Sequence, residues 1–294
     1  MLRLKASLVL DCGAELGEGL QLFPDGDLRW VDLTEGKIFR FDGQANQALH
    51  GFDHEVSKAL PANQGTIALG RYGPIAIDQS GQVVGSLDLL DSGSNLRLSD
   101  GAVLPDGSLV VGILERDLAA GQGSLLQLTN ELEIREMVGG ATIPNGCALL
   151  PAGQALVWVD SPTQTLSLLQ WSEATGSLGL PMPLASIPTE HGVPDGLCVD
   201  GEGGIWVAMW GGGKVLRLSP EGEIELIVEV GTPFVTSCSF DRANNLLITT
   251  AAVTIPKDQR SNFPGAGGIW IVPANQHGRT GQKITVANLS RLFG

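Results

Sequence analysis

The sequence is poor in positive charge and in tyrosine. Its 294 residues include 18 lysines and arginines against 32 aspartates and glutamates, a formal net charge of −14, and a single tyrosine. An acidic surface repels phosphate backbones and anionic lipids, so we expect neither nucleic acid nor a membrane as a partner. No apolar run approaches the ~20 residues that a membrane-spanning helix needs.

Cysteine is also scarce, and its spacing excludes the common metal motifs. Cys12, Cys147, Cys198 and Cys238 form neither a Cys-x-x-Cys pair nor a ligand pattern with histidine. Three of the four lie in apolar, strand-like runs, where cysteine usually acts as a small buried hydrophobic residue. A reducing cytoplasm fits this usage. The N-terminal apolar run before Asp11 is too short for a signal peptide, which also favours the cytoplasm.

Long helical patterns are missing, and 40 glycines indicate many tight turns. Short apolar strands follow turn sequences at six places: 23–32, 60–70, 104–113, 150–160, 199–210 and 240–251. A further strand follows each of them: 37–42, 73–78, 123–129, 164–171, 213–219 and 268–273. The stretch from Pro194 to Gly222 shows the unit most clearly, as three strands joined by Gly-rich turns.

The repeat has the length of a propeller blade. The turn markers are separated by 39, 42, 46, 50 and 41 residues, and they are Gly26, Gly65, Gly107, Gly153, Gly203 and Asn244. This period, made only of short strands, predicts an all-β, six-bladed β-propeller of four-stranded blades, with residues 1–294 as one domain. Two β-sandwiches or a β-helix are the alternatives, and neither needs so long a period. The N-terminal run LRLKASLVL is predicted to join the last blade and close the ring.

Three stretches and the tryptophans complete the fold prediction. Residues 114–123 and 254–268 are predicted to be loops because glycines or prolines interrupt them. Residues 85–96 are predicted to cross between strands near one mouth of the ring. Five tryptophans in or beside strands indicate packing between blades, with stacking of one of them on a sugar as the alternative; they are Trp30, Trp158, Trp206, Trp210 and Trp270.

One polar residue recurs at a constant offset, eight positions before each turn marker. The six residues are Glu18, Ser57, Ser99, Asn145, Asp195 and Thr236. Equivalent positions in a propeller lie on one ring around the central channel, so we expect these side chains to share an axis. Three of them are oxygen ligands followed by glycine, which lets backbones approach closely. The alternative is that they only cap strands, since Asn-Gly and Asp-Gly are common turn pairs.

Two carboxylates and an amide in one channel predict a divalent cation. Glu18 and Asp195 would repel each other unless positive charge lay between them. Ligation by oxygen alone, with Asn145 as the third ligand, favours calcium, magnesium or manganese over structural zinc. Three protein ligands would leave positions for water or substrate, as in catalytic sites. We expect calcium first, with manganese, magnesium or zinc as alternatives.

Other catalytic patterns are absent. The sequence contains no His-Glu-x-x-His, no Gly-x-Ser-x-Gly nucleophile motif and no phosphate-binding loop, and its four histidines have no triad context. The Gly-His and Trp-Asp repeats of protein-interaction propellers are missing as well. Metal-assisted chemistry in the channel is therefore the remaining candidate for catalysis.

The motifs around these residues resemble those of the senescence-marker-protein/gluconolactonase family, which includes regucalcin and bacterial sugar lactonases. The resemblance covers nearly the whole chain and is carried by LGEG (16–19), RLSDG (97–101), PNG (144–146), WVDS (158–161), residues 194–222, TSCSF (236–240) and GAGGIWIV (265–272). It implies a six-bladed propeller with one divalent metal in its channel.

The resemblance also implies roles for individual residues. Glu18, Asn145 and Asp195 match the metal ligands of the family, and Asp195 matches the acid that serves as general base. Arg97 matches a substrate-binding arginine, with a surface charge as the alternative. Ser99 stands where the family usually has a substrate-binding asparagine, which leaves the sugar preference open. A substrate-contacting acid aligns with Asp117, or else with the nearby Glu115.

The function implied is metal-dependent opening of a sugar lactone, a gluconolactonase-like carboxylic-ester hydrolysis. Asp195 would accept a proton from the attacking water, with the cation polarising the ester carbonyl. One alternative is a phosphotriesterase-like hydrolase that uses the same site. The other is a non-enzymatic, calcium-binding propeller. We expect a small-molecule substrate and a monomer or weak homo-oligomer.

Overall fold

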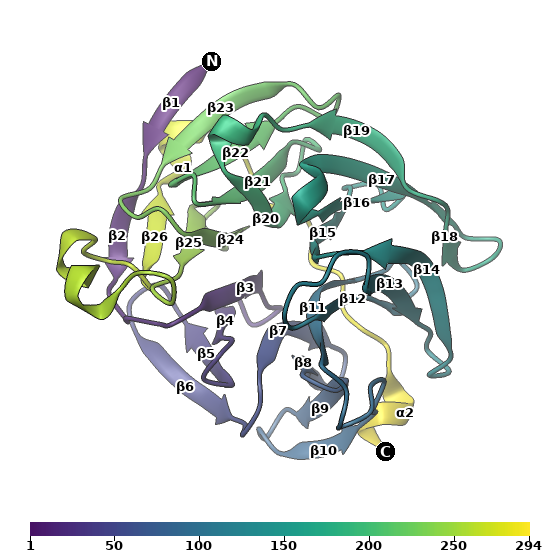
Figure 1. The fold of residues 1–294 in the computed structure, drawn as a ribbon. Coiled ribbons are helices and arrows are strands. Elements are labelled where there is room, and N and C mark those ends of the chain that lie inside the picture. Colours follow the sequence, from purple (N-terminus) through teal and green to yellow (C-terminus); the bar gives the residue numbers. More distant parts are fainter.

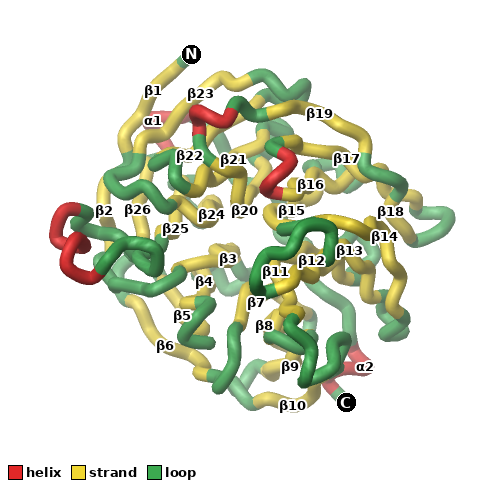
Figure 2. Tube along the Cα trace, viewed as in Figure 1, coloured by secondary structure: helices red, strands yellow, loops and turns green.

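Six β-sheets surround a central axis in the computed structural model, which describes residues 1–294 (Figure 1). Within each sheet the chain runs from the innermost strand outward and successive strands pair antiparallel, except that two N-terminal strands are the outermost strands of the last two sheets. Figure 2 shows that strands and loops make up nearly all of the chain. No helix has the length and apolar character to cross a membrane.

The first three sheets follow one another without a break in the sequence. From the inner strand outward they are β3 (Gly17–Leu22), β4 (Leu28–Asp32), β5 (Lys37–Phe41) and β6 (Asn46–Gly51); β7 (Val56–Ala62), β8 (Gly65–Gly70), β9 (Pro74–Asp78) and β10 (Val83–Ser86); and β11 (Leu96–Val103), β12 (Leu109–Glu115), β13 (Gly123–Leu128) and β14 (Ile134–Ala141).

The fourth and fifth sheets have five strands each, and the sixth has four. They are β15 (Pro144–Leu149), β16 (Ala155–Asp160) and β17 (Thr165–Ser172), with both β18 (Ser177–Leu178) and β19 (Met182–Ser186) paired to β17; β20 (Val193–Val199), β21 (Ile205–Trp210), β22 (Lys214–Leu218), β23 (Ile224–Glu229) and β1 (Leu2–Lys5); and β24 (Val235–Phe240), β25 (Leu246–Thr250), β26 (Ile269–Val272) and β2 (Ser7–Leu10).

The helices are all short. They are the 3₁₀ segments η1 (Ser161–Thr163), η2 (Thr189–His191) and η3 (Lys257–Asn262), and the α-helices α1 (Ala274–His277) and α2 (Ser290–Phe293). The predicted six units are confirmed, because each strand expected after a turn is present. The stretch 254–268, predicted as a loop, forms no strand and contains the 3₁₀ segment η3, which Pro256 immediately precedes.

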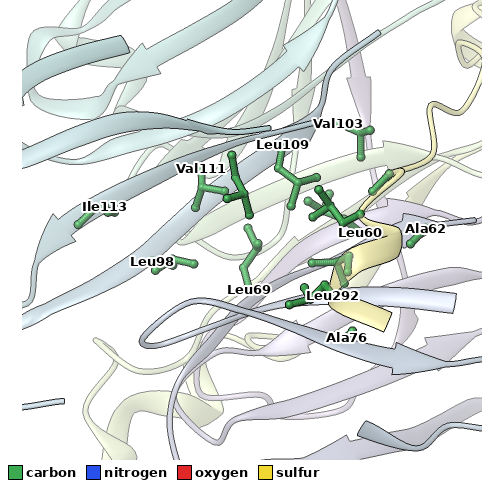
Figure 3. Close-up of a cluster of buried hydrophobic side chains, with 14 residues drawn as sticks. Leu60, Ala62, Leu69, Ala76, Leu98, Val103, Leu109, Val111, Ile113 and Leu292 are labelled. Atoms are coloured by element: carbon green, nitrogen blue, oxygen red, sulfur yellow. The ribbon is translucent and has the colours of Figure 1, made fainter. Parts of the chain in front are cut away.

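The core lies between adjacent sheets, where apolar side chains from facing strands interlock. Between the second and third sheets, Leu60 and Leu69 pack with Val111, and α2 adds Leu292 at the edge of the same cluster (Figure 3). These side chains alternate along their strands with residues that face the opposite side of the sheet. Each sheet is therefore buried on both faces, which is why the strands are so rich in leucine, isoleucine and valine.

Both ends of the chain bind to the ring. β2 pairs antiparallel with β26, and β1 pairs parallel with β23, so the N-terminal segment lies along the outer edges of two neighbouring sheets (Figure 1). The C-terminal segment crosses to the other side of the ring. There Ala287 N donates a hydrogen bond to Pro61 O in β7 at 2.8 Å. Asn63 N, in the turn after β7, donates to Ala287 O at 3.0 Å.

Candidate functional site

All six innermost strands have an irregular register at the same place. In each, the pairing with the next strand shifts next to the polar residue of the repeat, as between Glu18 and Gln21 in β3 and between Pro144 and Cys147 in β15. The other four shifts lie at Val56–Lys58, Leu98–Gly101, Pro194–Leu197 and Val235–Ser237. A bulge re-aims the side chains around it, so the repeat directs one polar group per sheet toward the channel.

Glycines let neighbouring inner strands approach one another at these bulges. A side chain at Gly146 would lie 2.4 Å from the backbone oxygen of Asp195, and one at Gly196 would lie 2.7 Å from that of Thr236. Both distances are too short for any Cβ atom. The glycine that follows a ring residue is therefore needed for close packing around the axis, as the sequence predicted.

The polar residues open into a cavity of about 390 Å³ at one end of the channel. Five of the six predicted ring residues line it, and they are Glu18, Ser57, Ser99, Asn145 and Asp195. The sixth, Thr236, is fully buried, and its hydroxyl donates a 2.5 Å hydrogen bond to the backbone oxygen of Gly17. Arg97 also lines the cavity. The structure thus brings together Arg97 and all three predicted metal ligands.

Asn145 and Asp195 are in direct contact. The amide nitrogen of Asn145 donates hydrogen bonds to Asp195 Oδ1 and, at 3.3 Å, to the hydroxyl of Ser161. Asp195 is only 7% exposed. A buried carboxylate held by one amide keeps further lone pairs free for another partner in the cavity.

The acidic groups of the cavity are electrostatically costly. Burial and then the charge of Asp100 raise the pKa of Glu18 to about 7, against a smaller lowering by the backbone N–H of Gly19. Burial and the charge of Glu18 raise the pKa of Asp195 well above its ordinary value, although Asn145 opposes this. The two carboxylates therefore compete for the ionised state, and positive charge between them would favour both.

A buried ion pair that the sequence analysis missed lies beside these acids. Lys58 Nζ contacts Asp100 Oδ1 at 2.5 Å, and the side chains are 6% and 11% exposed. Burial lowers the pKa of Lys58, but Asp100, Cys147 and Glu18 together more than compensate, so the pKa is raised overall. The signal in the sequence was a lysine inside the apolar run of residues 56–62, next to ring residue Ser57.

The donor set of the cavity fits a hard divalent cation. Two carboxylates and one amide supply oxygen, and Asn145 could present its oxygen by a half turn of the amide. Lys58, the buried ammonium nearby, is already engaged with Asp100 and leaves Glu18 and Asp195 without a paired cation. No group of three or more His, Cys, Asp or Glu side chains in the chain, the cavity included, is placed to hold a metal ion, so the amide of Asn145 is needed as the third ligand.

Arg97 and Ser99 occupy the same inner strand, β11, but only Arg97 has donors to spare. One guanidinium nitrogen of Arg97 donates to its neighbour's oxygen, Leu98 O, at 2.9 Å, and burial lowers the pKa of this arginine. The hydroxyl of Ser99 donates to the backbone oxygen of Pro144 in the next sheet. Ser99 is thereby used to tie two blades together, which leaves its hydroxyl hydrogen unavailable to a ligand.

Asp117 and Glu115 do not line the cavity. Both carboxylates accept hydrogen bonds from the amide nitrogen of Asn95, that of Asp117 at 2.8 Å, in an exposed part of the loop after β12. The leucines on either side, Leu114 and Leu118, line the cavity instead. A substrate contact by Asp117 stays a prediction. It would require the carboxylate of Asp117 to leave Asn95 and move to the cavity.

Trp210 differs from the other tryptophans. Trp30 and Trp206 are fully buried between sheets, as predicted for blade packing. Trp210 is partly exposed, stands over the ring of Phe234 at a centroid distance of 4.7 Å, and lines the cavity. Packing between blades therefore describes only part of the role of Trp210. Its position at the end of β21 brings it to the mouth of the channel.

Comparison with known proteins agrees with this architecture. A family model described as the SMP-30/gluconolactonase/LRE-like region matches residues 16–252. Regucalcin from Xenopus laevis is 27% identical over 264 residues, covering 84% of this chain and 86% of its own length. Pentonolactonase XacC from Haloferax volcanii is 28% identical over 250 residues, covering 83% of this chain and 84% of its own.

A solved structure shows that the fold is shared. The crystal structure of a calcium-binding protein, regucalcin from Agrobacterium tumefaciens, superposes with a TM-score of 0.88 at 21% identity and covers 98% of both chains. The residues matched by the family model include all six inner strands. They also include the polar residues from Glu18 to Asp195 that line the cavity. The chain belongs to the SMP-30/gluconolactonase/LRE-like family.

Proposed function

We propose that the protein is a metal-dependent lactonase of the gluconolactonase type, which opens a lactone by attack of water on the ester carbonyl. The observation that carries this proposal is the contact of Asn145 with buried Asp195 in a cavity that Glu18 and Arg97 also line. The pentonolactonase among the relatives supports a lactone as substrate.

The residues of the cavity suit the steps of ester hydrolysis. Arg97 offers planar N–H donors that can hold the ring oxygen or hydroxyl groups of a lactone. Asp195 would accept a proton from water. In the structure the amide of Asn145 contacts its carboxylate, which brings two of the three proposed ligands together. A divalent cation held by Glu18, Asn145 and Asp195 would supply the positive charge that polarises a carbonyl and acidifies water.

We propose calcium as the cation, with manganese, magnesium or zinc as alternatives. Oxygen ligands favour calcium over softer metals. The calcium-binding description of the Agrobacterium regucalcin supports the same choice.

The N-terminal segment is proposed to hold the ring closed around this site. Its two strands lie on the edges of the fifth and sixth sheets and join them through one short turn at Ala6.

We also propose that the protein is located in the cytoplasm, since all four cysteines are free, including Cys198 and Cys238 with their sulfurs 3.7 Å apart.

The test is a lactonase screen after chelation and repletion with calcium, manganese, magnesium or zinc. We expect one cation to restore turnover of lactones, and Asp195→Asn to lower kcat/KM on the order of 10³-fold. Thr236→Ser is the matched control, because it changes a ring residue that does not line the cavity. Full activity of Asp195→Asn would overturn the mechanism.

The same screen separates the rival functions. Hydrolysis of an aryl phosphotriester in preference to every lactone would favour the phosphotriesterase-like alternative. Tight calcium binding without turnover of any lactone would favour a non-enzymatic calcium-binding propeller.

A further inference from the structure

Part of the cavity lining is apolar. Leu16, Leu118, Ile143, Val193 and Trp210 line it, and each is at least partly exposed; we call this set the apolar wall. Leu118 is 48% exposed and Val193 36% exposed. Such exposure is unusual for large apolar side chains grouped around one concave site, and it marks a surface for an apolar ligand group.

Leu118 has an unfavourable backbone conformation. Its φ is +60°, in the left-handed region that bulky residues seldom adopt. A turn places it there, with Leu118 N donating to Glu115 O at 2.8 Å. Backbone conformations of this kind persist where surrounding contacts enforce them, and they cluster at ligand sites.

The charged side chains at the start of the same loop, Glu115, Arg116 and Asp117, bind other groups of the protein. Arg116 forms an ion pair with Glu55 at 2.6 Å, and Asn95 binds the carboxylates of both Glu115 and Asp117. These contacts anchor the loop with its charges turned away from the cavity. Leucine is consequently the side chain that this loop presents to a ligand.

Val193 and Trp210 extend the wall next to the predicted catalytic acid. They are register partners on β20 and β21, and Val193 precedes Asp195 by two residues. The indole of Trp210 rests on Phe234 with an interplanar angle of 45°, so its ring is supported from behind. A substituent next to the reacting carbonyl would lie against this pair.

Among the lining side chains, Arg97, Ser161 and Thr254 keep hydrogen-bond donors for a ligand rich in hydroxyl groups, and the other lining hydroxyls do not. The hydroxyl hydrogens of Ser57 and Ser99 are donated to backbone oxygens of Leu69 and Pro144. Arg97 is the cationic side chain among the lining residues. Sugar hydroxyls placed against the apolar wall would lose water without gaining a partner, which disfavours their binding.

We propose that the cavity takes a lactone with an apolar substituent, an alkyl or aryl group that packs against Leu118, Val193 and Trp210, in preference to a fully hydroxylated aldonolactone. This inference rests on the proposed lactonase function and narrows its substrate class. Leu118 is then a specificity-determining residue of the site.

The test compares δ-decalactone, unsubstituted δ-valerolactone and gluconolactone on the metal-loaded protein, together with binding of an unreactive δ-lactam that carries the same alkyl chain. We expect kcat/KM for δ-decalactone to exceed that for either other lactone on the order of 10-fold. Leu118→Asn, which tolerates the left-handed backbone, should raise KM for δ-decalactone and the Kd of the lactam about 10-fold. Its effect on δ-valerolactone should stay within about twofold.

Leu132→Asn is the matched control. Leu132 has a φ of +67° in a similar turn, with its N–H donating to Thr129 O, but it does not line the cavity. This variant should leave every kinetic and binding constant unchanged.

The outcomes separate the inference from the function on which it rests. If gluconolactone is turned over as well as δ-decalactone, or if the two leucine variants behave alike, the apolar preference is wrong while lactonase activity stands. If no lactone is hydrolysed but the alkyl lactam binds and Leu118→Asn weakens it, the lactonase proposal fails and the apolar ligand site stands. Absence of both hydrolysis and binding overturns both.

Discussion

Unpaired acidic groups distinguish the residues of the channel. Glu18 and Asp195 share one cavity, and the nearby Lys58 is occupied by Asp100. Ionised carboxylates in such surroundings destabilise the fold unless a cation binds. The same groups that make the site suitable for a metal should therefore lower the stability of the metal-free protein.

We expect Glu18→Gln to stabilise the metal-free protein at pH 8. The folded-state pKa of Glu18, about 7, lies above its ordinary value of 4.5, so its favourable contribution is present below pH 4.5 and is lost as pH rises through 7. Removing the carboxylate should raise the free energy of unfolding by roughly 1–3 kcal/mol at pH 8. Chemical denaturation of chelated protein at pH 5 and pH 8 measures this difference.

The same variant tests the cation site. Calcium should raise the melting temperature of the wild type and leave that of Glu18→Gln unchanged, since one ligand is lost. An equal calcium-dependent rise in both proteins would contradict the assignment of Glu18 as a ligand.

Another buried acid, Asp200, lies outside the channel and has a structural role. It is fully buried and accepts hydrogen bonds from the indole of Trp206 at 2.9 Å and from Arg217 Nε at 2.8 Å. It also closes the turn before β21 through the N–H of Gly204. One carboxylate thus fixes a turn and neutralises a buried guanidinium.

Asp200→Asn should cost about 3 kcal/mol of unfolding free energy, because it leaves the charge of Arg217 without its buried partner. Asp106→Asn is the matched control. Asp106 closes the corresponding turn of the third sheet through Ser108 N at 3.0 Å, but it is exposed and binds no arginine. Urea denaturation of both variants measures the free energy of unfolding that each loses. Equal losses in the two variants would show that only the turn contributes.

At the scale of single elements, strand edges determine how the ring is completed. β1 and β2 cover the outer edges of β23 and β26, and Ala6 N between them donates to Glu229 O at 2.9 Å. An uncovered strand edge pairs readily with another chain. We therefore propose that the first ten residues contribute to solubility as well as to stability.

Deletion of residues 1–10 should lower the melting temperature and promote association. It exposes two strand edges, whereas deletion of residues 1–5 exposes only that of β23 and should have a smaller effect. Thermal unfolding followed by light scattering tests both. A melting temperature unchanged by the longer deletion would contradict ring closure by the N-terminal segment.

For the whole molecule, we propose that residues 1–294 form one domain. Sheets pack against their neighbours all round the axis, and the C-terminal segment adds Leu289 and Leu292 to the core between the second and third sheets (Figure 3). Contacts that link sheets in this way couple their unfolding.

Leu292→Ala should lower the free energy of unfolding by roughly 2–4 kcal/mol and still give a single calorimetric transition. The leucine is 5% exposed and packs on the second sheet, whereas its neighbour Arg291 is exposed. Arg291→Ala should change the stability by less than about 0.5 kcal/mol. Two separate transitions in the wild type would argue against a single domain.

The six repeats and their ring positions could be predicted because both depend on local order. A turn, an alternating strand and a polar residue at a constant offset recur within each unit, whatever the other units do. Closing six such units into a ring places equivalent residues at equivalent depths. Glu18, Asn145 and Asp195 could therefore be assigned to one cavity without coordinates.

Contacts between different units were decided only by the tertiary structure. Lys58 meets Asp100 from another sheet, Asn95 turns Asp117 away from the cavity, and Trp210 reaches the mouth from the end of its strand. Such contacts depend on how loops and bulges direct each side chain, and the repeat does not encode these directions. The repeat in the sequence is enough to predict the blades and the ring of polar groups. Which other side chains surround that ring depends on how each blade packs on the next.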